Sequence, residues 1–178
     1  MYNYYEPPKK HKVFISFYHH DDQKYKNYID KYLSGNIINK SVSDGEYSTD
    51  NSDEYIKRLI REDKVSDSSV VIVLVGSNTK NRKHVDWEIY AGLRSSINGR
   101  SGLVGILLPE FPIDINGNYY TRDLPARLGD NVESGYAKCY TWNYAISHFD
   151  EIVEDAFKDR IALSDKMIND RPQMQRNL

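Results

Sequence analysis

The stretch Ser69–Leu93, SVVIVLVGSNTKNRKHVDWEIYAGL, contains the pattern that determines the fold. It begins with the continuous apolar run Val70–Val75, which is short, β-branched and typical of a fully buried strand. A polar turn starts at Gly76, and a helix that includes Glu88 follows it. In open α/β sheets, ligands bind beyond the carboxyl ends of the strands. Glu88, in the first turns of this helix, is therefore the acid of greatest interest.

The rest of the chain repeats this alternation of strand and helix. Further strands are expected at Lys12–Phe17, Ile37–Val42, Leu103–Leu108 and Ala137–Thr141. The central strands are apolar on both faces, as strands of a covered parallel sheet must be. The pattern predicts an α/β fold, a flavodoxin-like doubly wound five-stranded parallel sheet with strand order 2-1-3-4-5.

The helices between these strands are predicted from residues that cap or end helices and from the spacing of apolar residues. Asp21 or Asp22 is expected to cap the first helix, and Gly35 to end it. Asn98-Gly99 is expected to stop the third helix, and the last is expected to span Trp142–Leu163. Apolar residues at helical spacing on the first helix are expected to pack against the sheet: Tyr25, Tyr28, Ile29, Tyr32 and Leu33.

The length of 178 residues fits one domain of ordinary size. We expect a flexible arm over residues 1–11, a single domain over 12–163, and a polar tail over 164–178 that frays. Between 109 and 135 the periodic pattern is lost. Such a long connection is either functional or contains a short element.

Composition restricts the partners and the compartment. The net charge of −2 gives no general argument for nucleic-acid binding. The single cysteine, Cys139, excludes an internal disulfide and suits a reducing compartment. It is expected to be a small buried apolar residue rather than a nucleophile. No signal peptide is recognisable, and the longest apolar runs are too short to span a bilayer. These features predict a soluble cytoplasmic protein with no nucleic-acid or membrane partner.

Three segments converge at the carboxyl edge of the predicted sheet. With strands one and three as neighbours, the switch point lies between them, and residues 16–22, 44–51 and 76–88 meet there. They supply aromatic, small polar, histidine and acidic side chains: Phe17, Tyr18, Trp87, Ser16, Ser77, Asn78, His19, His20, His84, Asp44, Asp86 and Glu88. A cleft with aromatic walls and a few polar groups is the usual form of a small-molecule site.

Several familiar sites do not fit this edge. The turn after the first strand has neither the glycines and lysine of a Walker loop nor a G-x-G-x-x-G fingerprint. A response-regulator receiver would need an aspartate at the end of strand three, where Gly76-Ser77 stands. In the run His19–Asp22, adjacent side chains rarely converge on one ion, and no i, i+4 histidine pair supports a metal. We therefore predict no metal site.

Four segments, taken in order, resemble a known family. Lys12–Phe17 is similar to the first strand of TIR domains, and Val70–Ser77 to their central strand. Val85–Ile89 falls where TIR enzymes carry a helix with the catalytic glutamate. The segments VFISFYHHDD, VGSNT, HVDWEI and LPARLGDN resemble more closely the TIR-like proteins of bacterial Thoeris antiphage defence. The resemblance covers the chain from about residue 12 to residue 142.

The resemblance implies an enzyme that cleaves the nicotinamide–ribose bond of NAD, with NAD as substrate and no separate cofactor. It implies a cyclic ADP-ribose-type or related messenger that activates a separate effector protein, and a phage-derived trigger. Glu88 would be the catalytic carboxylate. Phe17 and Trp87 would stack on nicotinamide or adenine. Polar contacts to ribose or amide groups are assigned to Ser16, Asp44 and Asn78, with His84 also among the substrate-binding residues.

One difference from the family leaves the product open. Many TIR enzymes carry a tryptophan four residues before the catalytic glutamate, where this chain has His84. Its tryptophan, Trp87, directly precedes Glu88. Hydrolysis, cyclisation and transfer to another acceptor therefore all stay open as fates of the ribosyl intermediate.

Simpler interpretations stand beside these. Glu88 could be a helix acid favoured by the macrodipole. Phe17 could be plain core, and Asp44 could only begin a turn with Gly45. A non-catalytic TIR-type module that signals by assembly, as a homo-oligomer for example, would also use this fold, because a fold does not fix a function. A nucleoside-transferring enzyme on a similar sheet is a third alternative.

Overall fold

The computed structural model describes residues 9–41, 54–96 and 99–178. Five strands of these segments form one sheet: β1 (His11–Ser16), β2 (Ile37–Asn39), β3 (Val70–Val75), β4 (Gly102–Leu107) and β5 (Lys138–Thr141). Their order is β2-β1-β3-β4-β5, and each neighbouring pair is parallel. The doubly wound fold and the strand order predicted from the sequence are confirmed. β2 ends at Asn39 rather than at the expected residue 42.

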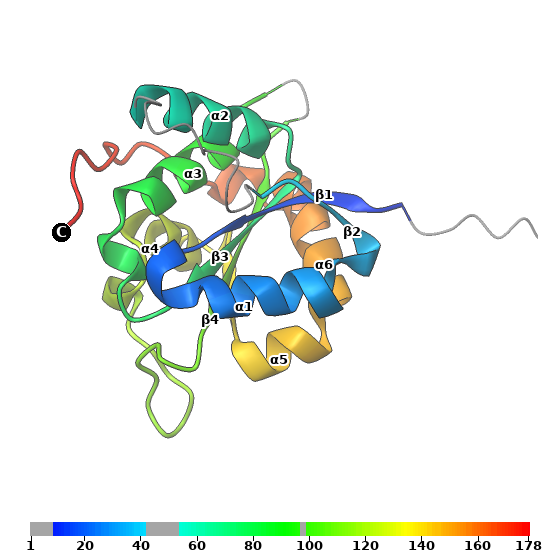
Figure 1. Ribbon diagram of the computed structural model, residues 1–178, viewed down its shortest axis with the longest axis vertical. Helices are drawn as coiled ribbons and strands as arrows, with labels where there is room; N and C mark the ends of the chain where they lie inside the picture. Colours follow the sequence, from blue (N-terminus) through cyan, green and yellow to red (C-terminus); the bar gives the residue numbers. More distant parts are fainter. Residues whose placement is uncertain (1–8, 42–53, 97–98) are drawn as a thin grey trace, which may run out of the picture.

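Helices cover both faces of the sheet (Figure 1). The side chains of α1 (His19–Tyr32), α5 (Trp142–Ser147) and α6 (Phe149–Ala162) pack on one face. Those of α2 (Glu54–Ser66), α3 (Lys83–Leu93) and α4 (Ala126–Glu133) pack on the other. Successive residues of β3 alternate between these two clusters, and the whole strand is buried. This double burial explains why β3 reads as one continuous apolar run.

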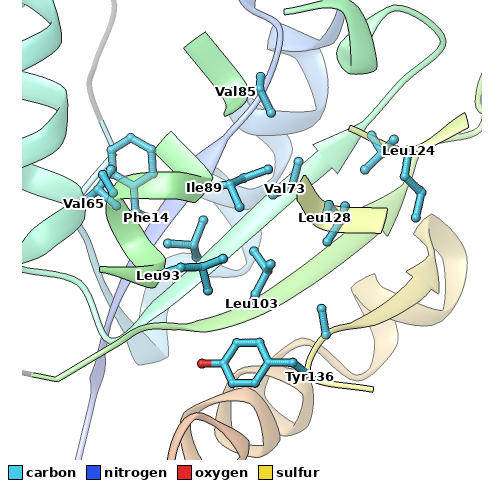
Figure 2. Packing of buried hydrophobic residues seen from close by; sticks show 14 of the residues in the cluster. Phe14, Val65, Val73, Val85, Ile89, Leu93, Leu103, Leu124, Leu128 and Tyr136 are labelled. Carbon is cyan, nitrogen blue, oxygen red and sulfur yellow. The ribbon is translucent and has the colours of Figure 1, made fainter. Parts of the chain in front are cut away.

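Figure 2 shows the core between the sheet and helices α2, α3 and α4. Helical spacing in the sequence predicts a buried stripe on α3 made of Val85, Ile89, Leu93 and Ile97. The first three lie in this core, each at most 2 % exposed. Burial of each such side chain stabilises the fold by roughly 1.5–3 kcal/mol. This stripe fixes the rotation of α3 about its axis. Ile97, the last residue assigned to it, lies outside the described residues.

Several predicted helix boundaries are wrong. α1 begins at His19, so Asp21 and Asp22 lie in its first turn, and no side chain caps it. α3 ends at Leu93, well before the Asn98-Gly99 stop. The last predicted helix is two helices, divided at His148.

The apolar stripe of α1 is only partly buried. Ile29 is fully buried, but Tyr28 and Tyr32 are 38 % and 60 % exposed. The predicted packing against the sheet holds for Ile29, Tyr25 and Leu33, whereas Tyr28 and Tyr32 contact each other. Their hydroxyl groups also favour contact with water.

The segment 109–135 contains short elements, as one of its two interpretations expected. The 3-10 helix η3 (Thr121–Asp123) leads into α4. After α6 and η4 (Ser164–Lys166), the chain returns along α4 and α3 and forms hydrogen bonds throughout, so the expectation that the tail frays is wrong. None of the described helices combines the length and apolar character that crossing a bilayer requires.

Candidate functional site

Glu88 lies where the first and third strands meet, as the strand order predicts. The chain leaves β3, passes through the 3-10 helix η2 (Thr79–Asn81) and enters α3, which carries Glu88 at 6 % exposure. Ser16, the last residue of β1, is paired in register with Val73 of β3 and is fully buried. Its hydroxyl donates a hydrogen bond of 2.5 Å to Oε2 of Glu88.

A positive charge from α2 completes the surroundings of this carboxylate. Nε of Arg61 lies 3.6 Å from Oε1 of Glu88. Burial raises the pKa of the Glu88 carboxyl, while the charge of Arg61 and the hydrogen bond from Ser16 oppose that rise. Buried acids with a raised pKa and a specific charged partner cluster at functional sites. The sequence analysis missed Arg61, because α2 was examined only for its apolar residues.

A small cavity lies beside Glu88. Its volume is about 10 Å³, and its lining comes from α2 and α3: Arg58, Arg61, Glu62, His84, Trp87 and Glu88. That space holds about one water molecule. Pockets for small ligands measure roughly 300–1,000 Å³. The described residues therefore hold this side of the site closed.

Trp87 forms one wall of the cavity. The guanidinium carbon of Arg58 lies 4.5 Å from the centre of its ring, and the His84 ring meets it edge-on at 5.1 Å. On its outer side, the indole N–H donates a 2.8 Å hydrogen bond to the carbonyl oxygen of Met174. The structure thus brings Trp87 and His84, both assigned to the site from the sequence, to the same cavity as Glu88.

The remaining assigned residues are more scattered. Phe17 is 6 % exposed and packs in the core on the face of α1, away from Glu88, because neighbouring strand residues point to opposite faces. Asn78 is exposed and donates a 2.9 Å hydrogen bond to Asp21. Asp44 lies outside the described residues.

A second buried acid lies at the same edge of the sheet. Asp22 of α1 is 4 % exposed, and the Thr79 hydroxyl donates a 3.3 Å hydrogen bond to its Oδ2. Burial raises the pKa of Asp22 to about 6, against the effect of that hydrogen bond. A Cβ on Gly76 would lie 2.6 Å from Oδ1 of Asp22, so the residue after β3 must be glycine for this approach. In the sequence, Asp22 was a candidate helix cap and a member of the run His19–Asp22 at this edge, and no local pattern indicated its burial.

Asp86 faces away from Glu88 and forms a buried ion pair with α4. Nε of Arg127, which is 0 % exposed, lies 2.9 Å from Oδ1 of Asp86. The backbone N–H of Met174 donates a 2.8 Å hydrogen bond to Oδ2. The sequence placed Asp86 among the acids of the cleft, and nothing in its local pattern pointed to Arg127 as its partner.

The thiol of Cys139 is unsuited to act as a nucleophile. Burial raises the pKa of the Cys139 thiol to about 12, so this sulfur stays protonated and weakly nucleophilic. Over the described part of the chain, no group of three or more histidine, cysteine or acidic side chains could hold a metal ion.

Comparison with known families identifies the chain. The family model described as Thoeris protein ThsB, TIR-like domain, matches residues 14–111. The chain belongs to this Thoeris TIR-like family. The match runs from β1 past the end of β4 and includes Ser16, Arg61 and Glu88. The Thoeris resemblance seen in the sequence is therefore confirmed.

Similarity to individual proteins is more distant. No curated protein matches the chain. Among solved structures, the chain is similar to the TIR domains of the activated Roq1 resistosome that directly recognises the pathogen effector XopQ. The sequences are 14 % identical, the alignment covers 88 % of this chain and 83 % of the other, and the TM-score is 0.42. A likeness this distant supports no conclusion about residues or activity.

Proposed function

We propose that this Thoeris TIR-like protein is an NAD-consuming enzyme that cleaves the nicotinamide–ribose bond during phage infection. The observation that carries the proposal is the Glu88 carboxylate, buried at the carboxyl edge of the sheet beside Ser16 and Arg61. In the proposed scheme the ribosyl group becomes a cyclic ADP-ribose-type or related messenger, which activates a separate effector protein in the cytoplasm.

The chemistry needs one carboxylate rather than two. Nicotinamide in NAD is positively charged, so it leaves with the electron pair of the C1′–N bond as a neutral molecule and needs no general acid. The ribose passes through an oxocarbenium-like state, as in glycoside hydrolysis. An ionised Glu88 stabilises that positive charge. The oxygen of the acceptor, a hydroxyl group or water, then bonds to C1′, and its proton passes to the solvent. The positive charge of Arg61 favours the ionised form of Glu88.

The test compares two isosteric substitutions. Glu88→Gln keeps the size of the side chain and removes its charge, so messenger formation in infected cells should fall by about 100-fold or more. Glu151→Gln changes an exposed acid of α6 at the other edge of the sheet and should leave product formation unchanged. Mass spectrometry of small molecules from infected cells measures both. Equal messenger levels in the Glu88 variant and the parent would contradict the proposal.

One observation favours the rival interpretation, a module that signals by assembly. The cavity at Glu88 holds only about 10 Å³, whereas an exposed apolar loop lies after β4. In that loop Ile115 is 100 % exposed and Tyr120 is 66 % exposed. The side chain of Asp114 accepts hydrogen bonds from Asn116 and Asn118, which give the loop a defined shape. In the rival interpretation, Ile115 and Tyr120 would belong to a contiguous apolar patch of the kind that marks protein–protein interfaces.

Cell survival during infection separates the two functions. If the protein acts by catalysis, Glu88→Gln should abolish defence and Ile115→Asp should retain it. Assembly through the loop predicts the reverse. Expression and thermal unfolding of both variants should be compared with those of the parent. Ile115 is fully exposed, so Ile115→Asp should change stability little.

A further inference from the structure

Residues 169–178, here called the strap, follow α6 and η4 and run beside α4 and α3 (Figure 1, red). Their hydrogen bonds join residues far apart in the sequence. At the start of the strap, the side-chain amide of Asn169 donates to the Tyr90 carbonyl at 3.1 Å. Further along, Asn177 Oδ1 accepts from the backbone N–H of Lys83 at 2.9 Å. The strap therefore contacts α3 near both of its ends.

The first half of the strap is anchored on a buried charge. Nη1 of Arg127 donates to Asn169 Oδ1 at 3.0 Å, and Nη2 donates to the Arg171 carbonyl at 2.8 Å. Because Arg127 is 0 % exposed, its N–H groups have no access to solvent. A buried guanidinium left without acceptors is costly. These contacts hold 169–172 in place.

The second half of the strap reaches the side chains that enclose the cavity beside Glu88. Oε1 of Gln173 accepts a 2.7 Å hydrogen bond from Arg58, and the Met174 carbonyl accepts a 2.8 Å hydrogen bond from Trp87. Arg58 and Trp87 also pack on each other and line the cavity. Two of the lining side chains are therefore held from outside by consecutive strap residues.

We propose that Gln173 and Met174 are positioning residues that keep the cavity closed by holding Arg58 and Trp87 over Glu88. Release of the two hydrogen bonds lets both side chains turn outward and enlarges the cavity. The nature of the ligand that then enters, a dinucleotide, rests on the proposed function. The closure itself rests only on the contacts of the strap.

The experiment uses Trp87 as its own reporter. Trp142→Phe removes the other of the two tryptophans. In that background, Met174→Pro removes the N–H that anchors this part of the strap to Asp86. The carbonyl of residue 174 then shifts away from Trp87, and the hydrogen bond between them is released. Met174→Ala is the matched control, because it keeps both backbone groups. Acrylamide quenching of Trp87 fluorescence should rise about fivefold in the proline variant and stay at the parent value in the alanine variant.

A second variant and a kinetic readout separate positioning from general damage. Gln173→Ala removes the acceptor of Arg58 without altering the backbone. It should lower the KM for NAD while kcat changes less, because a closed site reduces apparent affinity by the fraction of molecules that are open. Equal quenching in the proline and alanine variants at position 174, or an unchanged KM in Gln173→Ala, would overturn the proposal. The proposed function is decided separately, by messenger formation in infected cells. If the resting parent converts no NAD, the quenching result still decides whether the strap closes the cavity.

Discussion

Acids that are buried at the carboxyl edge of the sheet and acids that are half-exposed at its amino edge have opposite pKa shifts. At the carboxyl edge, burial raises the pKa of both Glu88 and Asp22. At the amino edge, a hydrogen bond with Lys12 holds the pKa of Asp67 below its usual value, and one with His11 does the same for Glu154. The half-exposed acids stay partly hydrated and gain a hydrogen bond, whereas the two buried acids lose hydration that their partners only partly replace.

The larger cavity lies at the amino edge of the sheet, not beside the buried acids. A hollow of about 1190 Å³ lies at the amino edge, lined by residues that include His11, Asp67 and Glu154. The cavity at Glu88 has about 10 Å³. We place the candidate site at the smaller one, because an acid whose pKa is raised by burial beside a specific charged partner indicates chemistry, and open volume alone does not.

The largest expected effect comes from the buried ion pair at the carboxyl edge. Arg127→Met leaves Asp86 buried without its cation, which should cost about 3–5 kcal/mol of unfolding free energy. Lys12→Met breaks the half-exposed pair with Asp67 at the amino edge and should cost less than about 1 kcal/mol. Urea unfolding measures both changes. Similar costs at the two edges would contradict the contrast between buried and exposed charges.

The next effect is a pH dependence set by Asp22. Its folded pKa of about 6 exceeds the ordinary 3.8, so its contribution to stability is present below 3.8 and is lost as the pH rises through about 6. The difference between these values corresponds to about 3 kcal/mol. Asp22→Asn cannot ionise and should escape this loss. Unfolding free energies measured across this range should therefore favour the variant increasingly as pH rises.

A flat difference between Asp22→Asn and the parent across the whole pH range would show that Asp22 ionises as freely as an exposed acid. Thr79 offers a control, since Thr79→Val removes the hydrogen bond that opposes the rise. It should shift the midpoint of the pH dependence upward, because the ionised carboxylate loses a donor.

The smallest effect has the opposite sign and belongs to Glu154. Its lowered pKa contributes stability that is present above the ordinary 4.5 and is lost as the pH falls. Its side chain is 46 % exposed, so solvent screens the interaction. Glu154→Gln should cost less than about 1 kcal/mol near neutral pH and nothing in acid. Thermal unfolding at neutral and at acid pH measures the change in stability. A gain in stability of Glu154→Gln at neutral pH would contradict the prediction.

Local patterns in the sequence were enough to predict the sheet and the place of Glu88. The apolar run of β3 and the stripe of Val85, Ile89 and Leu93 are set by residues close together in the chain. The strand order brings the ends of β1 and β3 together and so predicts that Ser16 and Glu88 lie close, but the sequence assigned Ser16 to the substrate rather than to Glu88. Alternation along the predicted strand Lys12–Phe17 places Phe17 on the face opposite Ser16.

The surroundings of Glu88 could not be predicted in the same way. Arg127 reaches Asp86 across a separation of 41 residues, and Met174 reaches it across 88. A polar segment such as 169–178 carries no periodic signal, because single hydrogen bonds rather than a buried apolar face hold it. Such contacts form only in the finished fold. The polar composition of the tail therefore predicted a frayed end instead.

The position of the strap in the chain sets an order of events during synthesis. Ribosomes make proteins from the N-terminus, and folding begins while the chain is still emerging. All five strands and Glu88 precede residues 169–178 in the sequence. Until residues 169–178 have been made, Trp87 therefore lacks the Met174 carbonyl and Arg127 lacks the Arg171 carbonyl. The residues that cover the cavity are thus supplied only after every strand of the sheet has been made.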